Sequence, residues 1–239
     1  MSTALLSAHW TNLLVANYEV DKHLLEKFLP AGTELNDWNG KYFISLVGFQ
    51  FSKTKLLGIP SPFYRSFPEI NLRFYVKRKI KDGWRKGVVF IKEIAPAKLI
   101  GYMASLLYNE NFITLPLKSR IGHTTDKINI EYSFTINNKP NYIKAIVNTS
   151  PANYAEDALE DFITTHYWGY TRVNEKITKE FQVVHRPWKI HPVLSSEIKI
   201  DGEKLYGNDF TKCFITPPFS IFLMDGSETK VTRPLVIKD

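Results

Sequence analysis

The stretch from Pro68 to Val76 alternates polar and apolar side chains. Its polar members are Glu69, Asn71, Arg73 and Tyr75, and its apolar members are Ile70, Leu72, Phe74 and Val76. Successive side chains on a β-strand point to opposite faces, so the four polar groups share one face. If that face is covered, its groups need partners from the protein, from water or from a ligand. We therefore predict that this strand forms the wall of a pocket that binds a small organic molecule.

Two interpretations of the charged pair on this strand stay open. Glu69 could transfer protons as a general acid or base beside a cation, while Arg73 could bind a carboxylate or carbonyl group of the ligand. Alternatively, the two side chains form a structural ion pair that needs no ligand. In that case the chain is a structural or interaction protein with a self-satisfied polar core.

A lysine offers a third kind of chemistry. Lys118 follows the apolar step Leu115-Pro116-Leu117, and Arg120 lies two residues on. Burial and a neighbouring cation would lower the pKa of the Lys118 amine, which could then attack a ketone and form a Schiff base, with Glu69 transferring protons. The alternative is a surface lysine that points to water, as most lysines do. Arg120 and His185 complete the set of candidate ligand-binding residues.

The sequence contains no motif that is typical of a metal or cofactor site. It has no glycine-rich phosphate loop, no GxSxG elbow and no HExxH motif. The single cysteine, Cys213, excludes an internal disulfide framework and a cysteine zinc site. The histidines are too scattered for a linear metal motif. We expect neither a metal nor a cofactor.

Charge and hydropathy limit the partners. The net charge is +7, and much of it lies between Val76 and Gly87 around an Asp82-Gly83 hairpin turn. We interpret this stretch as a solvated hairpin tip; a nucleic-acid patch with Trp84 as a stacking platform is the alternative, but no other nucleic-acid motif supports it. No apolar run is long enough to span a membrane, and no signal peptide is visible. We expect a cytoplasmic protein without membrane or nucleic-acid partners, in which exposed strand edges allow a homodimer.

The elements that position these residues are mostly strands. Residues 41–51 predict a strand buried on both faces, 52–67 a loop or lid, and 128–147 a hairpin with a wet outer face. Helices are expected near residue 21, from Pro96 to about Asn109, and from Ser150. With 239 residues, 14% of them aromatic, and no linker-like tract, we predict one β-rich α+β domain over residues 1–239. It consists of a large antiparallel, barrel-like sheet with two or three helices.

These residues together resemble a known family. The matching segments, in order, are His9-Trp10, 28–32, Asn39-Gly40, 47–49, 69–76, Leu115-Pro116, Phe162-Ile163 and 185–188. They are similar to the YqjF-like bacterial proteins, a domain of unknown function, over nearly the whole chain. That family belongs to the acetoacetate-decarboxylase-like superfamily, so the resemblance implies a cone-shaped antiparallel barrel with a central cavity.

The resemblance does not carry over the decarboxylase nucleophile. The decarboxylase uses a Schiff-base lysine whose pKa a neighbouring cation lowers. By register, Leu117 falls at the nucleophile position and Lys118 at that of its activating neighbour. The family also usually shows Glu-Arg-Tyr where this chain has Thr165-His166-Tyr167. The departure implies a different choice of ligand.

Overall fold

The computed structural model describes residues 4–60, 65–96 and 111–238. Strands dominate this part of the chain. In chain order, the elements of the first half are β1 (Ala4–Val20), α1 (His23–Glu26), β2 (Glu34–Leu35), β3 (Tyr42–Leu56), β4 (Ile59–Pro60), β5 (Ser66–Ile80), β6 (Gly83–Ala95), β7 (Phe112–Thr114) and β8 (Lys118–His123). Those of the second half are β9 (Lys127–Ile136), β10 (Lys139–Asn148), α3 (Leu159–Thr164), β11 (Trp168–Arg172), β12 (Ile177–Val184), β13 (Ile190–Lys199), α4 (Gly202–Tyr206), the 3-10 turn η1 (Asn208–Phe210), β14 (Ser220–Thr232) and β15 (Leu235–Lys238).

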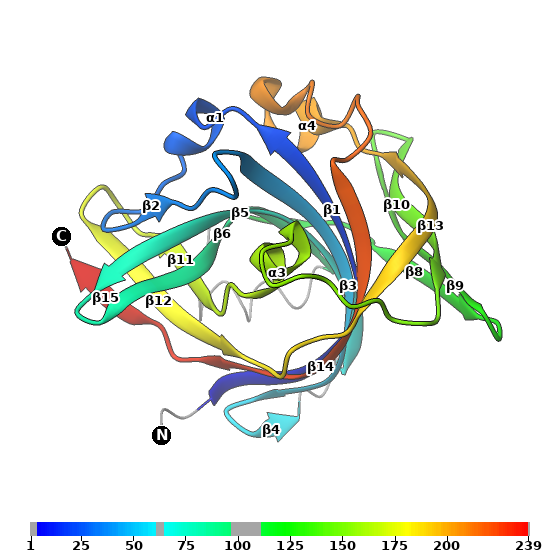
Figure 1. Cartoon of the computed structure of the whole chain (residues 1–239), viewed down its shortest axis with the longest axis horizontal. Helices are drawn as coiled ribbons and strands as arrows, with labels where there is room; N and C mark the ends of the chain where they lie inside the picture. The colour runs from blue at the N-terminus through cyan, green and yellow to red at the C-terminus, as the bar shows by residue number, and fades with distance from the viewer. Residues whose placement is uncertain (1–3, 61–64, 97–110, 239) are drawn as a thin grey trace.

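One continuous sheet runs through the molecule and closes on itself. Its path is β15-β12-β11-β6-β5-β3-β1-β14-β13-β10-β9-β8. A further pairing of β12 with β14, at Val183 and Val231, closes the strands from β12 to β14 along this path into a ring. Figure 1 looks through this ring, with α3 lying across its opening. The fold is therefore β-rich and barrel-like, as predicted.

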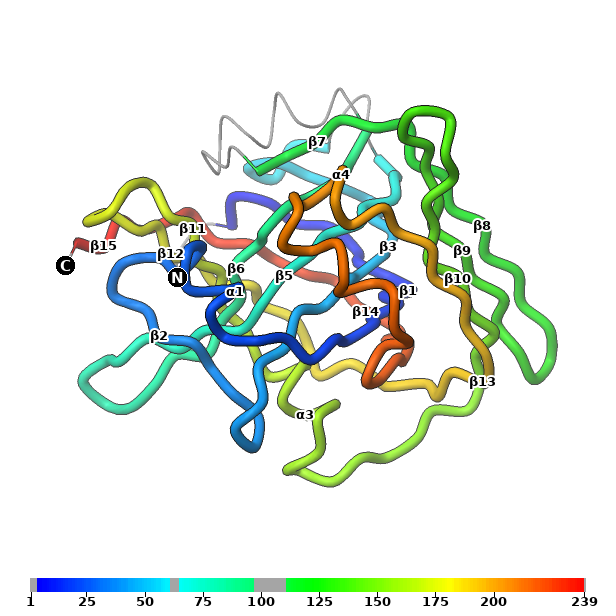
Figure 2. The backbone as a smooth tube through the Cα atoms, turned by 90° about the horizontal axis from the view of Figure 1, so that it is seen from above, coloured from blue at the N-terminus to red at the C-terminus, as the bar shows by residue number. Residues whose placement is uncertain are grey.

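The strands beyond β14 form a second layer outside the ring. β13, β10, β9 and β8 lie together beside it in both views (Figures 1 and 2). Tyr132 of β9 reaches from this layer to the ring (we call this contact the seam), and its hydroxyl donates a hydrogen bond to the Asn12 carbonyl at 2.9 Å. Gly48 of β3 lies directly beneath the Tyr132 ring. One apolar core fills the space between the ring and this layer, and another fills the ring interior.

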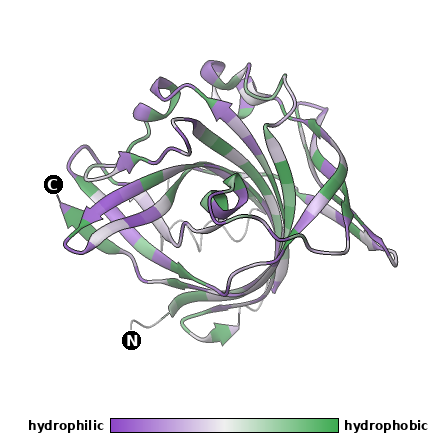
Figure 3. Ribbon diagram, in the orientation of Figure 1, coloured by the Kyte–Doolittle hydropathy of each residue, from purple (hydrophilic) through white to green (hydrophobic). Residues whose placement is uncertain are grey.

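β5 is consequently covered on both faces. Its apolar residues Ile70, Leu72, Phe74 and Val76 are fully buried in the outer core. Its polar face points into the ring. Colouring by hydropathy shows hydrophobic segments recurring along β1, β3 and β14 (Figure 3). The prediction that β5 is a wall with two covered faces is confirmed.

Several predicted elements need correction. Residues 52–67 were expected to be a loop. Instead β3 continues to Leu56, and its pairing with β5 extends to Ser52 opposite Ser66. The helix expected from Ser150 begins only at Leu159, because the Ala152 amide donates a hydrogen bond to the Ile190 carbonyl instead. The helix expected from Pro96 to Asn109 lies outside the described residues. In the part of the chain that the structure describes, no helix is long and apolar enough to cross a membrane.

Candidate functional site

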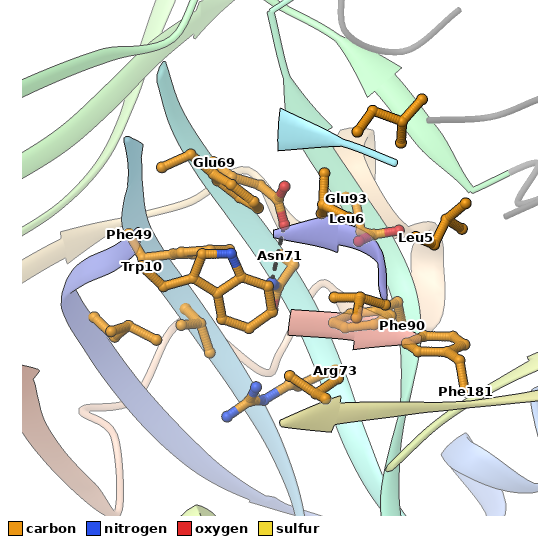
Figure 4. A pocket seen from close by; sticks show the side chains of 16 residues that line it. Leu5, Leu6, Trp10, Phe49, Glu69, Asn71, Arg73, Phe90, Glu93 and Phe181 are labelled. Carbon is orange, nitrogen blue, oxygen red and sulfur yellow. Dashed lines mark hydrogen bonds between the residues drawn. The ribbon is translucent and has the colours of Figure 1, made fainter. Parts of the chain in front are cut away.

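The polar face of β5 opens onto a cavity inside the ring. Glu69 and Asn71 are buried there, with 4% and 3% of their surface exposed, and Arg73 is half-buried. Trp10 of β1 and Glu93 of β6 add two further polar side chains (Figure 4). The rest of the lining is apolar and comprises Leu5, Leu6, Leu13, Val47, Phe49, Phe51, Leu56, Phe90, Phe181, Val183 and Val231.

The cavity is small and narrow. The space open to the centre of a water molecule is about 50 Å³. By this measure a single water needs about 10–15 Å³. The cavity can therefore hold a few waters or a ligand of a few non-hydrogen atoms.

Three polar atoms of this lining have no hydrogen-bond partner. Within the described residues, the buried side-chain atoms without one include Trp10 Nε1, Asn71 Oδ1 and Arg73 Nε. A buried polar atom left unpaired costs about 1–3 kcal/mol. Natural proteins leave few such atoms, and each one calls for an explanation, such as a catalytic role or a water or ion that pairs with it. The lining thus presents two N–H donors and one amide oxygen acceptor that a bound molecule could satisfy.

Glu69 is one of the two acidic residues that line the cavity, with Glu93. Asn71 Nδ2 donates a hydrogen bond to Glu69 Oε1 at 3.3 Å. Burial raises the pKa of the Glu69 carboxyl to about 7, and the bond from Asn71 opposes that rise only in part. Near neutral pH the carboxyl is therefore present in both its neutral and its charged form, which suits a group that donates or accepts a proton.

The structural ion pair between Glu69 and Arg73 is not formed in the described structure. The only side-chain bond found for Glu69 is the one from Asn71. The neighbouring strand β6 carries a β-bulge at this level, because Leu72 pairs with Lys92 whereas Arg73 pairs with Phe90, leaving Ile91 unmatched. A bulge bends the strand that carries it and redirects that strand's side chains. In Figure 4 the Arg73 guanidinium points away from the Glu69–Asn71 pair.

Tyr75 shares the strand face but serves a different region. Its hydroxyl hydrogen-bonds the Ser45 hydroxyl, which in turn donates to Asn17 Oδ1. Its ring packs against Phe162 and His166, with centroids 5.3 and 4.8 Å away. Tyr75 therefore fills the ring beneath α3 and does not line the cavity.

His166 completes this buried polar cluster. Its Nδ1 lies 2.7 Å from the Phe162 carbonyl, to which it donates, and its Nε2 accepts from Asn36 Nδ2 at 2.9 Å. Burial lowers the pKa of His166 to about 3, with a smaller contribution in the same direction from Arg73. The imidazole is neutral at physiological pH, and its hydrogen bonds are satisfied without a ligand.

Lys118 and Arg120 lie outside the ring. Both are exposed on β8, the last strand of the sheet path, and neither lines the cavity. Leu117, which the family resemblance predicted to fall at the nucleophile position, is buried in the outer core. The structure therefore does not bring the expected lysine to Glu69, because β8 joins the second layer rather than the ring.

His185 lies near the cavity without lining it. Its ring stacks on Trp188 at a centroid distance of 3.7 Å, and its Nδ1 donates to the Arg186 carbonyl at 2.8 Å. Trp188 in turn contacts Trp10, with centroids 6.4 Å apart. Burial lowers the pKa of His185. His185, predicted to bind the ligand, is therefore packed against a tryptophan and does not line the cavity.

Two residues of the site were not predicted from the sequence as cavity residues. Trp10 stood out only for its family resemblance, although its indole N–H is one of the unpaired donors. Glu93 lies opposite Asn71 on β6, and 6% of it is exposed. The described part of the chain has no group of three or more His, Cys, Asp or Glu side chains that could hold a metal ion.

Comparisons with known proteins agree with this architecture. Residues 7–228 match the family model DUF2071, described as an uncharacterized conserved protein. The chain is 28% identical over 183 residues to the uncharacterized protein YqjF of Bacillus subtilis (strain 168), covering 75% of this chain and 72% of that protein.

Solved structures with the same fold are distant in sequence. Acetoacetate decarboxylase from Legionella pneumophila has a TM-score of 0.66 at 12% identity, covering 100% of this chain and 90% of that one. An acetoacetate decarboxylase-like enzyme from Sphingomonas wittichii RW1 has a TM-score of 0.66 at 11% identity, covering 100% and 95%. The enduracididine biosynthesis enzyme MppR, complexed with pyruvate, has a TM-score of 0.63 at 13% identity, covering 100% and 93%. These likenesses show the acetoacetate-decarboxylase-like fold.

Proposed function

The chain belongs to the DUF2071 family of uncharacterized conserved proteins, and from that premise we propose that it binds a small carboxylate- or carbonyl-containing molecule in the ring cavity. Glu69, Asn71 and Arg73 of β5 are the proposed ligand-binding side chains, and Trp10 joins them from β1. The ligand is short, because the cavity admits only a few non-hydrogen atoms.

The observation that carries this proposal is the group of unpaired polar atoms in an otherwise apolar cavity. A self-satisfied polar core would pair Arg73 with Glu69 and leave no donor free. Instead Trp10 Nε1 and Arg73 Nε both lack an acceptor. An arginine N–H suits an oxygen that carries negative charge, as a carboxylate does.

A fold neighbour supports the size and class of the ligand. MppR was crystallised with pyruvate and with the condensation product of pyruvate and imidazole 4-carboxaldehyde. Pyruvate has six non-hydrogen atoms and a carboxylate, which fits the dimensions of this cavity. The identity of 13% makes this an argument by analogy of fold.

Thermal unfolding with a panel of short monocarboxylates tests the proposal. A ligand at about 100 times its Kd stabilises the folded chain by about 2.7 kcal/mol. For a chain of this size that corresponds to a rise in Tm of roughly 5–10 °C. We expect such a rise for the parent, its loss in Arg73→Ala, and its retention in Lys118→Ala, which changes an exposed cation outside the ring.

Two results would contradict the proposal. One is a parent protein whose Tm no short acid changes. The other is an Arg73→Ala variant that folds and still responds as the parent does. The more conservative Arg73→Lys keeps the charge but loses the Nε donor, so it gives a second measurement if the alanine variant does not fold.

A further inference from the structure

The cavity lining presents hydrogen-bond acceptors as well as donors. Asn71 Oδ1 is buried and unpaired. Its own amide nitrogen donates to Glu69 Oε1, so the two side chains are held together as one unit. In Figure 4 the indole nitrogen of Trp10 lies on the same side as this unit, and Arg73 lies beyond the other side of the Trp10 ring. A ligand between them meets the Asn71 acceptor and the Trp10 donor at one end and the arginine at the other.

A 2-oxo or 3-oxo acid satisfies only half of this lining. Its carboxylate and ketone oxygens all accept hydrogen bonds, and it has no N–H or O–H to donate. Such a ligand could pair with Trp10 and Arg73 but would leave Asn71 Oδ1 unpaired. A binding site built around a hydrogen bond discriminates strongly against an analogue that cannot make it.

We propose that the ligand is a short hydroxy acid whose carboxylate pairs with Arg73 and whose hydroxyl donates to Asn71 and accepts from Trp10. The hydroxyl supplies the donor that the buried amide oxygen lacks. This inference rests on the proposed function and narrows its ligand class.

The spacing along β5 is compatible with such a molecule. Asn71 and Arg73 are two residues apart on one strand face, so their Cα atoms are separated by about 6.6 Å. Their side chains reach into a cavity that holds only a few non-hydrogen atoms. A hydroxyl one or two carbons from a carboxylate can therefore contact both, and the apolar walls accommodate a methyl or ethyl tail.

The charge of Glu69 points to the same class. Burial raises its pKa to about 7, so an ionised fraction is present at neutral pH and repels acceptor oxygens placed beside it. A hydroxyl can donate to that carboxylate, whereas a ketone oxygen cannot. The hydroxy acid thus suits the ionised form of the Glu69–Asn71 unit.

Matched pairs of acids test the inference by isothermal titration calorimetry. The probes are 2-hydroxybutyrate with 2-oxobutyrate, 3-hydroxybutyrate with 3-oxobutyrate, and butyrate as the member without the extra oxygen. We expect the hydroxy member of at least one pair to bind roughly tenfold more tightly than its oxo partner, as one buried hydrogen bond implies. Butyrate should bind more weakly than that hydroxy acid.

Asn71→Leu should abolish this preference, because it replaces the acceptor by an apolar group of similar size. Asn129→Leu is the matched control, since it makes the same change at an exposed position of β9. Asn71→Ser provides a second variant if the leucine variant unfolds. It shortens the acceptor and should reduce the preference.

The outcomes separate the two proposals. Binding with no preference, or with the oxo acids tighter in both pairs, overturns the hydroxy-acid inference and leaves the proposed function standing. A preference that persists in Asn71→Leu also overturns it. If no acid of the panel binds the parent, the proposed function fails, and this inference fails with it.

Discussion

Glu69 is buried in the proposed binding cavity, and its burial changes how its carboxyl titrates. The carboxyl is held inside the ring with one hydrogen bond, from Asn71. Desolvation favours its neutral form and raises its pKa to about 7. A carboxyl in this state costs the folded chain free energy whenever it is ionised, and that cost can be measured through the pH dependence of stability.

Replacing Glu69 by Gln should remove one component of that pH dependence. Below pH about 4.5 the carboxyl is protonated in both the folded and the unfolded chain, and its contribution to stability is fully present. As pH rises to about 7 the unfolded chain loses the proton before the folded chain does. The free energy of unfolding therefore falls, by on the order of 3 kcal/mol. We therefore expect Glu69→Gln to exceed the parent in stability by up to this amount at about pH 8 and to gain little at about pH 5.

Urea unfolding at the two pH values measures the difference. Glu175→Gln, an exposed glutamate outside the cavity, is the control and should leave stability unchanged at both. A constant difference between Glu69→Gln and the parent across this range would show that the carboxyl does not titrate as described.

At the scale of elements, the seam between β3 and β9 holds the second layer against the ring. A Cβ added to Gly48 would lie 2.5 Å from Tyr132 Cδ2 and 2.9 Å from Cγ, which is closer than packed carbon atoms approach. The Tyr132 ring is fully buried and tied by its hydroxyl to Asn12, so it has little freedom to move.

Gly48→Ala should therefore destabilise the protein by about 1–3 kcal/mol, the usual cost of overpacking a core. Gly122→Ala is the matched control, because a Cβ there meets no atom within 4 Å. The control should be neutral or slightly stabilising. Chemical denaturation of both variants checks the prediction, and equal stabilities would mean that the Tyr132 ring can shift to accommodate a methyl group.

The elements that could be predicted were those whose pattern is local. Alternation identified β5 and β9, the return of the predicted hairpin identified β10, and a run with no polar face identified β3. The extension of β3 past Phe51 and the late start of α3 could not be predicted, because both depend on pairing with distant strands.

The site was partly hidden for the same reason. Extending the pairing of Ile80 with Gly83 along a regular hairpin would put Lys92 opposite Asn71. The unmatched Ile91 shifts the register and puts Glu93 there instead. Likewise, nothing in the residues around Lys118 shows that β8 joins the outer layer. The predicted wall is present, whereas the residues that other strands contribute to the cavity required the three-dimensional pairing.

At the scale of the whole molecule, two of the buried ionisable groups in the ring interior have pKa values that are shifted in opposite directions. Glu69 lines the cavity, and His166 lies under α3 against Tyr75. Burial raises the pKa of the first to about 7 and lowers that of the second to about 3. Both shifts arise because the ring excludes water, which disfavours a charge of either sign.

The contribution of His166 is present above pH about 6.5 and is lost as pH falls towards about 3, because the unfolded chain takes up a proton that the folded chain refuses. Between about pH 4.5 and 6.5 the contribution of Glu69 to the free energy of unfolding changes in the opposite direction. For each group the change is about 1.4 kcal/mol per pH unit. The two effects therefore nearly cancel in the parent over this range.

Each single variant should reveal the pH dependence of stability that the remaining group causes. Glu69→Gln leaves His166 unopposed, so its stability should fall by roughly 3 kcal/mol as pH drops from about 6.5 to 4.5. His166→Gln keeps a side chain that can bond Asn36 and should instead gain stability relative to its own value over the same drop. The double variant should be nearly flat, like the parent. Urea unfolding at three pH values across this range tests all four proteins, and parallel curves for the two single variants would contradict the shared desolvation of the ring.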